Sequence, residues 1–504
     1  MLIVIINMCN KGGGAATGPE GVWNLLKGDN ANLAGYYETC SYGRQKIDFD
    51  NTVVIGPLNM PCNGIGSPIM GSVPWTVTSC RGQNPYGWFY WAEQTVAAAP
   101  YNIDLSRFNH RVMIMPRLHQ VFMEKDCDWA GISTTGPINP EPTKPNNYKY
   151  SYTWLAGDTW SSPWLWFHEL GHAVWLSHAN TPNQEYGDIA SAMGGVRGYG
   201  LRCYNAPQIW QLGWGSPFVL LTRMDLTPGQ TELKWIPTVA SDPDHSIRIN
   251  LAQDAFNPKD PSGVPTSCLS QYWVSYRTSS SVYDMPWRDM GSGLALVHRW
   301  DAGSFSALIK PLLLAQLKVP NAKAPYDTQV TSWEAPGCRL VITAMDMWDG
   351  YALIGVCVKT SDDDFEFNCG DGLDDDCDGL IDMRDPDCLR PPGKTPQRTT
   401  RPPPPPKKAD EGDEDGPYWI SAPGLIYEGL LHLMFGDNTS KKGSPPPAEP
   451  TVSTRAKSPK PSGSTVAGRN ADEAPDKSPP PPPPKNVKPS PKIRPSRRSA
   501  VRLV

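Results

Sequence analysis

The stretch FHELGHAVWLSH, residues 167–178, places three histidines and a glutamate at spacings suited to binding a metal ion. Ser162 and the proline after it are residues that favour a helix start, so a helix is predicted over residues 163–175. On such a helix His168 and His172 lie one turn apart on one face. Two imidazoles in this arrangement can bind a single Zn²⁺ ion.

Glu169 follows the first histidine directly and therefore points about 100° round the helix from it. We expect it to act as a general base rather than as a ligand. Zinc lowers the pKa of a bound water toward about 7, the glutamate accepts the proton, and the proton passes to the leaving amine of a cleaved peptide bond. The competing interpretation is a core helix with hydrogen-bonded histidines, because HExxH also arises by chance.

A catalytic zinc site needs a third protein ligand, and three residues compete for that position. His178 lies six residues after His172 and is favoured if the helix ends near Trp175 and the chain turns back. Glu185 would correspond to a glutamate supplied by a second helix, although the spacing is short. Asp188, in the sequence EYGD, is the other alternative.

Further segments appear in an order that resembles the gametolysin family, metzincin zinc peptidases of volvocine green algae: CSYGRQKIDF, RVMIMPRL, DCDWAGIS, the HELGH helix, YGDIASAMGG and RCYNAPQIWQLGW. The resemblance covers about residues 1–235 and extends less specifically to 360. It implies zinc ligands at His168, His172 and His178, a catalytic Glu169, and a methionine turn at Met193 beneath the zinc site. It also implies secretion with a signal and propeptide, and wall or matrix glycoproteins rich in hydroxyproline as substrates.

The chain departs from the metzincin signature HExxHxxGxxH at one position, where Trp175 replaces the glycine. Glycine allows a sharp turn out of the helix. This departure keeps open a second function, a catalytically degenerate matrix glycoprotein that binds metal without turnover. Tyr186, Tyr199 and Tyr204 could donate hydrogen bonds to a transition state, but aromatic core positions are the favoured interpretation for all three.

A second acidic motif lies in the stretch CGDGLDDDCDGLIDMRDPDC. Asp374, Asp376 and Asp378 alternate, Gly379 stands at the sixth position and Asp385 at the twelfth, as in a calcium loop of the EF-hand type. No flanking helices are predicted, so a true EF-hand is not expected. The sequence favours a Ca²⁺ site over a solvated acidic linker.

Twelve dispersed cysteines in a chain rich in Trp, Gly and Pro indicate disulfides and an oxidising compartment. Cys338 and Cys357 flank a predicted hairpin turning at Asp349-Gly350, and we expect them to pair. Cys369, Cys377 and Cys388 are further candidates for bridges. The start, MLIVIINMC, has the pattern of a buried strand rather than of a signal peptide, so we expect either that the true amino terminus is missing from this sequence or that export uses a signal not visible in it.

Composition divides the chain into four parts. We predict an α/β (α+β) metzincin-like catalytic domain at 1–235, a β-rich, sandwich-like domain at 236–360, the calcium-like loop at 361–388, and a disordered proline-rich tail at 389–504. The tail carries a net charge of +9 and the rest −14, in a chain of −5 overall. No run of eighteen apolar residues is present, so no membrane span is expected.

The tail holds nearly half of the 54 prolines and favours extended polyproline II structure. Its composition suggests anchoring in a proline-rich matrix, with an inert linker as the alternative. It also contains an apolar stretch at 424–435 and a glycosylation sequon at Asn438.

The sequence therefore predicts a secreted zinc endopeptidase of the extracellular matrix or cell wall, with proline-rich glycoproteins as substrates. A nucleic-acid partner is not expected, because the basic charge lies in a proline tail and the body is acidic. The oligomeric state is not predicted.

Overall fold

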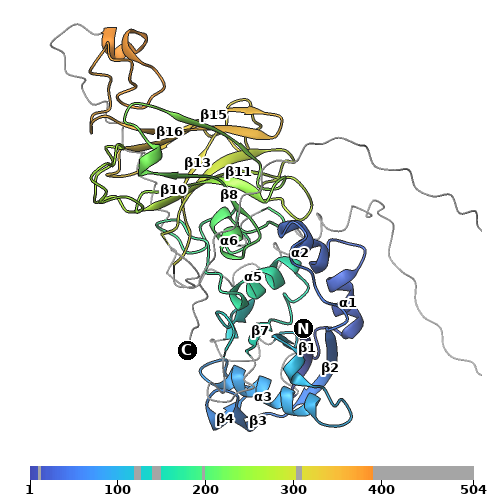
Figure 1. The fold of residues 1–504 in the computed structure, drawn as a ribbon. Helices are drawn as coiled ribbons and strands as arrows, with labels where there is room; N and C mark the ends of the chain where they lie inside the picture. Colours follow the sequence, from blue (N-terminus) through green and yellow to red (C-terminus); the bar gives the residue numbers. More distant parts are fainter. Residues whose placement is uncertain (10–12, 119–126, 139–148, 196–198, 302–308, 390–504) are drawn as a thin grey trace, which may run out of the picture. The chain divides into compact units, whose positions relative to one another are not determined.

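The computed structural model is a mixed α/β chain with several sheets and few helices (Figure 1). No helix among the described residues is long and apolar enough to cross a membrane. The predicted tail from 390 onward, with its apolar stretch and its sequon, lies outside the described residues. The structure describes residues 1–9, 13–118, 127–138, 149–195, 199–301 and 309–389.

The first sheet has five strands in the order β2-β1-β5-β7-β6. Four strands run parallel, whereas β6 is antiparallel and forms an edge. The first strand confirms the prediction of a buried strand at the start of the chain, because parallel strands covered on both faces are continuously apolar. The strands are β1 (Leu2–Met8), β2 (Val53–Met60), β5 (His110–Ile114), β6 (Gly131–Ser133) and β7 (Ser151–Leu155).

The two faces of this sheet pack into separate cores. Ile3 and Ile5 of β1 point into a cluster with α1 (Pro19–Lys27), α2 (Leu33–Cys40) and α5 (Pro163–Ala173). Alternate residues, Leu2 and Val4, point to the opposite face. That face is covered by α3 (Asn84–Ala97), beside the hairpin of β3 (Asn63–Ser67) and β4 (Gly71–Thr76).

Two further sheets share one apolar core and so pack face to face. Their strand orders are β13-β12-β11-β10-β8 and β14-β15-β16-β9. The bounds are β8 (Ser216–Thr222), β9 (Glu232–Pro237), β10 (Asp244–Asn250), β11 (Gln271–Thr278), β12 (Gly293–Arg299), β13 (Leu312–Leu317), β14 (Ser332–Glu334), β15 (Leu340–Trp348) and β16 (Tyr351–Val358).

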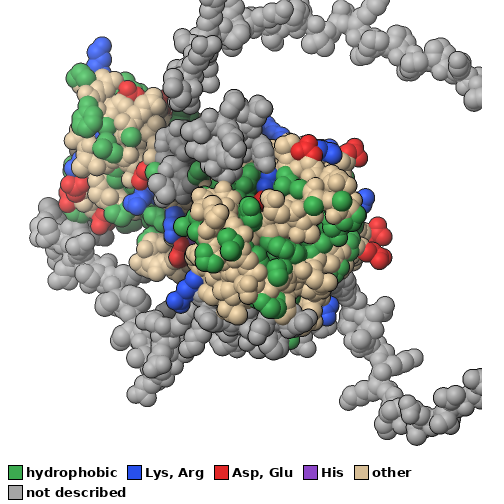
Figure 2. Space-filling model, turned by 90° about the horizontal axis from the view of Figure 1, so that it is seen from below, with side chains coloured by type: hydrophobic (Ala, Val, Ile, Leu, Met, Phe, Trp, Pro, Cys, Tyr) green, Lys and Arg blue, Asp and Glu red, His purple; other side chains and the backbone are tan. Residues whose placement is uncertain are grey.

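Short helices complete the described chain. They are α6 (Ala206–Gln211), η1 (Leu105–Arg107), η3 (Arg223–Asp225), η4 (Asp382–Arg384) and η5 (Pro386–Leu389). On the face shown in Figure 2, acidic and basic side chains are scattered among apolar and neutral ones rather than gathered in one patch.

The predicted hairpin is confirmed, since β15 and β16 join at Asp349-Gly350 and both turn residues have positive φ. The predicted pairing of Cys338 with Cys357 is wrong. Cys357 lies opposite Val341, three residues beyond Cys338, and an odd offset in a strand points the side chain to the other face. All twelve cysteines form bridges: Cys9–Cys62, Cys40–Cys203, Cys80–Cys127, Cys268–Cys338, Cys357–Cys377 and Cys369–Cys388.

Candidate metal centre

Helix α5 carries the HELGH motif and begins at Pro163, as predicted. Ser162 occupies the N-cap position, but its side chain makes no capping hydrogen bond. The helix ends at Ala173, two residues earlier than expected. Its buried Trp166 and Phe167 pack in the core shared with α1 and α2, so the helix is fixed against the sheet.

The chain leaves α5 through a sharp turn at Trp175. This tryptophan has φ +73°, the left-handed conformation that usually requires glycine. Its indole lies against Gly136, where an added Cβ would be 2.1 Å from the ring. The carbonyl of Trp175 accepts a hydrogen bond from Gln211 Nε2 at 2.9 Å. A non-glycine residue therefore makes the turn that brings His178 back toward the helix.

The three predicted histidines meet, with candidate ligand atoms within 4.8 Å of one another. Nε2 of His172 and Nε2 of His178 are 3.0 Å apart. Each Nδ1 instead faces an oxygen outside the cluster at 2.8 Å. These oxygens are the carbonyl of Ala192 for His168, the carbonyl of Leu176 for His172, and Oε1 of Glu185 for His178.

Burial keeps these imidazoles neutral. It lowers the pKa of His168 and His178, and it lowers the pKa of His172 to about 4. With the proton held on Nδ1 by an oxygen acceptor, the lone pair of Nε2 points into the cluster. Neutral imidazoles with converging lone pairs are the form of histidine that binds metals.

Glu169 is buried beside this cluster, and burial raises its pKa to about 8. Its Oε2 has no hydrogen-bond partner among the residues that the structure describes. The side chain lies against Gly131 of β6, where a Cβ would be 2.8 Å from the carboxylate. The glycine thus allows the edge strand to approach the carboxylate closely.

The two rival ligands do not belong to the histidine group. Glu185 Oε1 lies 2.8 Å from Nδ1 of His178 and also accepts a hydrogen bond from Lys310 at 2.6 Å. Asp188 is fully buried, and its Oδ2 lies 3.0 Å from Nε2 of His298 on β12. Nothing in the local sequence indicated Lys310 or His298, because both lie more than a hundred residues from their partners.

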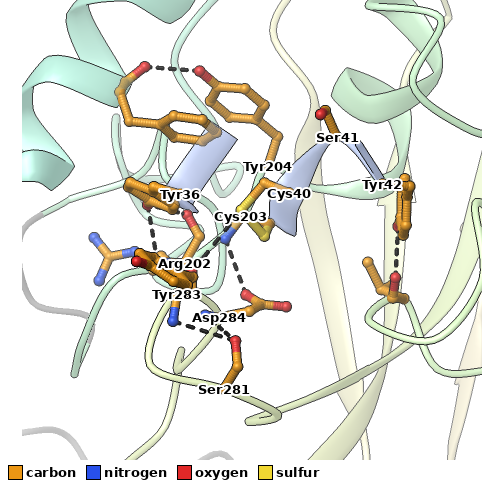
Figure 3. Close-up of a disulfide and its surroundings, with 12 residues drawn as sticks. Tyr36, Cys40, Ser41, Tyr42, Arg202, Cys203, Tyr204, Ser281, Tyr283 and Asp284 are labelled. Carbon is orange, nitrogen blue, oxygen red and sulfur yellow. Dashed lines mark hydrogen bonds between the residues drawn. A yellow bond between two sulfur atoms is a disulfide. The ribbon is translucent and has the colours of Figure 1, made fainter. Parts of the chain in front are cut away.

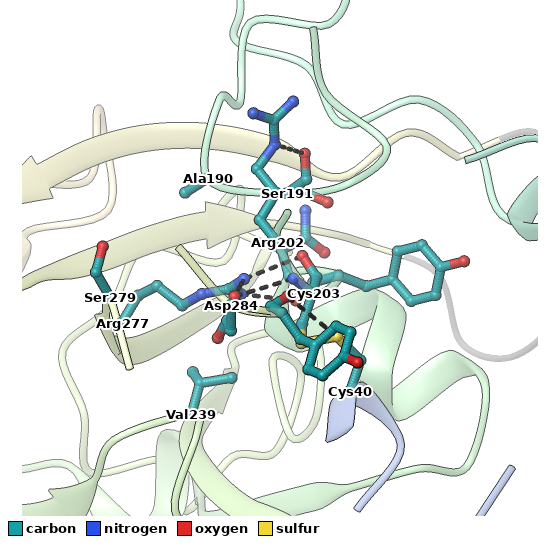
Figure 4. Close-up of polar contacts among 12 residues, drawn as sticks. Cys40, Ala190, Ser191, Arg202, Cys203, Val239, Arg277, Ser279 and Asp284 are labelled. Atoms are coloured by element: carbon teal, nitrogen blue, oxygen red, sulfur yellow. Dashed lines mark hydrogen bonds and ion pairs between the residues drawn. A yellow bond between two sulfur atoms is a disulfide. The ribbon is translucent and has the colours of Figure 1, made fainter. Parts of the chain in front are cut away.

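Met193 is buried in a turn closed by a hydrogen bond from the Gly194 amide to the Ser191 carbonyl. A Cβ on Gly171 would lie 2.7 Å from Met193 Sδ, so the methionine packs directly against α5 between the two helical histidines. Arg202 donates a hydrogen bond to the carbonyl of Ser191 (Figure 4). It also donates to the carbonyl of Gly195 and so brackets the turn.

The segment after this turn is fixed by a disulfide and by a buried ion pair. The Cys40–Cys203 bridge attaches it to the end of α2 (Figure 3). Asp284 accepts a hydrogen bond from the Cys203 amide at 3.0 Å and pairs with Arg277 of β11 at 2.5 Å (Figure 4). The β-rich sheets therefore contribute to the support of the methionine turn.

The three tyrosines lie in different surroundings. Tyr204 is buried, and its hydroxyl donates to the Phe167 carbonyl at 2.7 Å, so it supports α5 from the core. Tyr199 lies under the guanidinium of Arg288. Tyr186 has its ring 3.8 Å from the ring of His178 and is the tyrosine beside the cluster.

The acidic stretch forms three groups of carboxylates that share members, with ligand atoms within 4.8 Å in each. Asp374, Asp376 and Asp378 form one group, Asp376 also joins Asp385 and Glu366 in a second, and Glu366 joins Asp371 and Asp382 in a third. Burial is the main cause that raises the pKa of Asp374 and of Asp376 to about 6. Glu366 lies outside the loop spacing, so the sequence pattern does not indicate it. No α-helix flanks the stretch within the described residues, which end at 389.

A buried HExxH helix whose two histidines meet a third from the following turn is the arrangement of a metal-dependent peptidase. A model of the gametolysin peptidase M11 family matches residues 1–304, and the chain belongs to this family. The predicted resemblance is confirmed.

A curated relative, autolysin of Chlamydomonas reinhardtii, is 26% identical over 450 residues. The match covers 73% of this chain and 66% of autolysin, so it spans just under two thirds of the relative's length. No solved structure matches.

Proposed function

We propose that this protein is a secreted zinc endopeptidase of metzincin type that cleaves glycoproteins of a cell wall or extracellular matrix. The observation that carries the proposal is the orientation of the three imidazoles. Nδ1 of each imidazole faces an oxygen acceptor, so Nε2 of His168, His172 and His178 is left to bind a metal.

The histidine cluster fits a zinc ion. Two ligands of a tetrahedral zinc, each about 2.0 to 2.1 Å from the metal, lie about 3.3 Å apart. The observed separation between Nε2 of His172 and Nε2 of His178 is 3.0 Å, close to this value. When bound, zinc supplies a Lewis acid that polarises a carbonyl and makes water a nucleophile at neutral pH.

Glu169 is the general base in this proposal. A nearby cation favours its carboxylate form over the protonated form that burial alone favours. The unpartnered Oε2 can then accept a proton from water and donate it to the leaving amine. Met193 provides an apolar floor beneath α5, and it binds no metal.

A peptide can reach Glu169 along β6, because among the described strands this edge strand pairs only with β7. An extended peptide that adds to the free side forms main-chain hydrogen bonds with the strand. Because Gly131 of β6 contacts the carboxylate of Glu169, such a peptide would lie beside the proposed base. This supports a protein substrate that binds in extended conformation.

Secretion is supported by the six disulfides, since such bridges persist in oxidising compartments. The name of the relative, autolysin, supports a wall substrate. The second candidate, a metal-binding matrix protein without turnover, was suggested by Trp175. Trp175 adopts the left-handed conformation and so makes the turn expected of glycine, which weakens the case for a protein without turnover.

The test is zinc content by elemental analysis together with hydrolysis of a wall glycoprotein fraction and of a denatured protein, using the full chain. We expect one zinc per chain in the parent and in Glu169→Gln, with hydrolysis in the parent alone. The matched control, Glu38→Gln at an exposed position on α2, should keep both properties. Zinc without hydrolysis in the folded parent would support the non-catalytic alternative, and no zinc would refute the metal site.

A further inference from the structure

We propose that residues 366–385 form a calcium site, separate from the histidine cluster, with Asp376 as its central ligand. Two groups of carboxylates adjoin at this residue, one with Asp374 and Asp378 and the other with Glu366 and Asp385. All the donors are oxygens, which suit a hard cation such as Ca²⁺ rather than zinc. The inference does not depend on the proposed peptidase function.

The backbone between these ligands turns as a calcium loop does. Gly379, at the sixth position, has φ +96°, a conformation that glycine adopts readily. The amides of Asp378 and Gly379 donate to the two carboxylate oxygens of Asp374, at 3.1 and 3.0 Å. The turn therefore curls the alternating aspartates round a common point instead of letting them extend apart.

A buried carboxylate oxygen without a partner points independently to a cation as its ligand. Asp385 is 1% exposed, and its Oδ1 accepts a hydrogen bond from the Asp387 amide, whereas Oδ2 is buried and has no hydrogen-bond partner within the described part of the chain. Among the described residues, no lysine or arginine pairs with any of the five carboxylates of the two groups. Burying an uncompensated carboxylate is costly, and a divalent cation removes that cost.

The loop is fastened to the β-rich sheets next to the proposed ligands. Cys377 is bonded to Cys357 of β16, and the amide of Asp374 donates to the Gly229 carbonyl at 3.0 Å. Asp375 accepts a hydrogen bond from the Thr360 hydroxyl at 2.6 Å. An ion bound here would therefore hold the end of the described chain, through Leu389, against the sheet.

The site can be tested by titrating CaCl₂ into the full chain after its solutions have been freed of divalent ions by a chelating resin. Zinc is measured in the same samples, so that loss of the histidine-bound metal is not mistaken for an effect of calcium. We expect binding of at least one Ca²⁺ per chain with a Kd of about 10⁻⁴ to 10⁻³ M, the range of extracellular modules. Thermal unfolding should shift upward with calcium and far less with the same concentration of Mg²⁺, which prefers a stricter octahedral geometry.

Asp376→Asn is the decisive variant, because this side chain belongs to both groups. It should weaken calcium binding at least about tenfold and abolish the calcium-dependent thermal shift. Asp363→Asn removes one negative charge from an exposed position nearby and should bind calcium as the parent does. If Asp376→Asn does not fold, Asp378→Asn at an exposed ligand serves in its place. No calcium binding by the folded parent at about ten times the upper Kd, or equal losses in the variant and its control, would overturn the proposal.

Discussion

Replacing Glu185 should reveal how firmly His178 is held for the metal. Glu185→Ala removes the oxygen that lies 2.8 Å from Nδ1 of His178 and leaves this imidazole free to rotate or change tautomer. Removing the group that accepts a hydrogen bond from a metal-bound histidine typically lowers the metal affinity about 10- to 100-fold. Because the Glu185 side chain is 50% exposed and solvent can replace it, we expect the lower limit, about tenfold or about 1.4 kcal/mol.

The assay is competition for zinc between the protein and a chromophoric chelator, with peptide hydrolysis measured at limiting and at excess zinc. Glu185→Ala should lose activity at limiting zinc and recover it when zinc is in excess, because only the metal-bound fraction has changed. Glu185→Gln keeps an acceptor oxygen and should lose less affinity. Lys310→Met removes the other partner of Glu185 and serves as the control that leaves the bond to His178 in place.

Two results would refute this reasoning. Unchanged zinc affinity in Glu185→Ala would mean that the hydrogen bond does not position His178. A loss of kcat that excess zinc does not restore would mean that Glu185 acts on the chemical step and not through the histidine.

Three other predictions concern stability. Burial lowers the pKa of His245 to about 4, so this side chain stays neutral in the folded state, whereas in the unfolded chain it takes up a proton below about pH 6.5. The free energy of unfolding should therefore fall by about 1 kcal/mol from pH 6 to pH 5. His245→Asn should reduce this pH dependence, as measured by urea titrations at the two pH values. Gly136→Ala should lower the free energy of unfolding by about 2 to 5 kcal/mol, because the added methyl group meets the indole of Trp175 and the backbone is left-handed. In a Trp175→Gly background only the backbone strain remains, and the loss should be about 1 to 2 kcal/mol. Equal losses in the two backgrounds, measured by thermal unfolding, would exclude the clash. His298→Ala should lower the free energy of unfolding by about 3 to 5 kcal/mol, because Asp188 is left buried without this partner. A urea unfolding midpoint close to that of the parent would contradict this prediction.

Features with local causes could be predicted from the sequence. The start of α5 follows from a Ser-Pro pair before an apolar run, and the β15–β16 hairpin follows from Asp349-Gly350 between alternating residues. The spacing of His168 and His172 places them on one helical face whatever surrounds the helix. In these cases the signal lies within a few residues of the structure that it determines.

Features that depend on packing between distant segments could not be predicted. Which cysteine partners Cys338 depends on the register at the end of the hairpin and on Cys268, 70 residues away in the chain. Glu366 joins the acidic groups only because the chain folds back between the strands and the loop. The effect of Trp175 could not be judged either, because the pattern shows the missing glycine but not Gly136, which makes room for the indole.

The contact between His298 and Asp188 has a consequence for how this protein can be divided. His298 lies on β12 and Lys310 just before β13, yet they bind the two acidic residues that flank the proposed active site. A fragment that ended near residue 235 would keep every motif of the peptidase and lose both of these supports. The β-rich sheets are therefore no interchangeable module, and gene fusions or domain exchanges should keep the chain whole at least through Lys310.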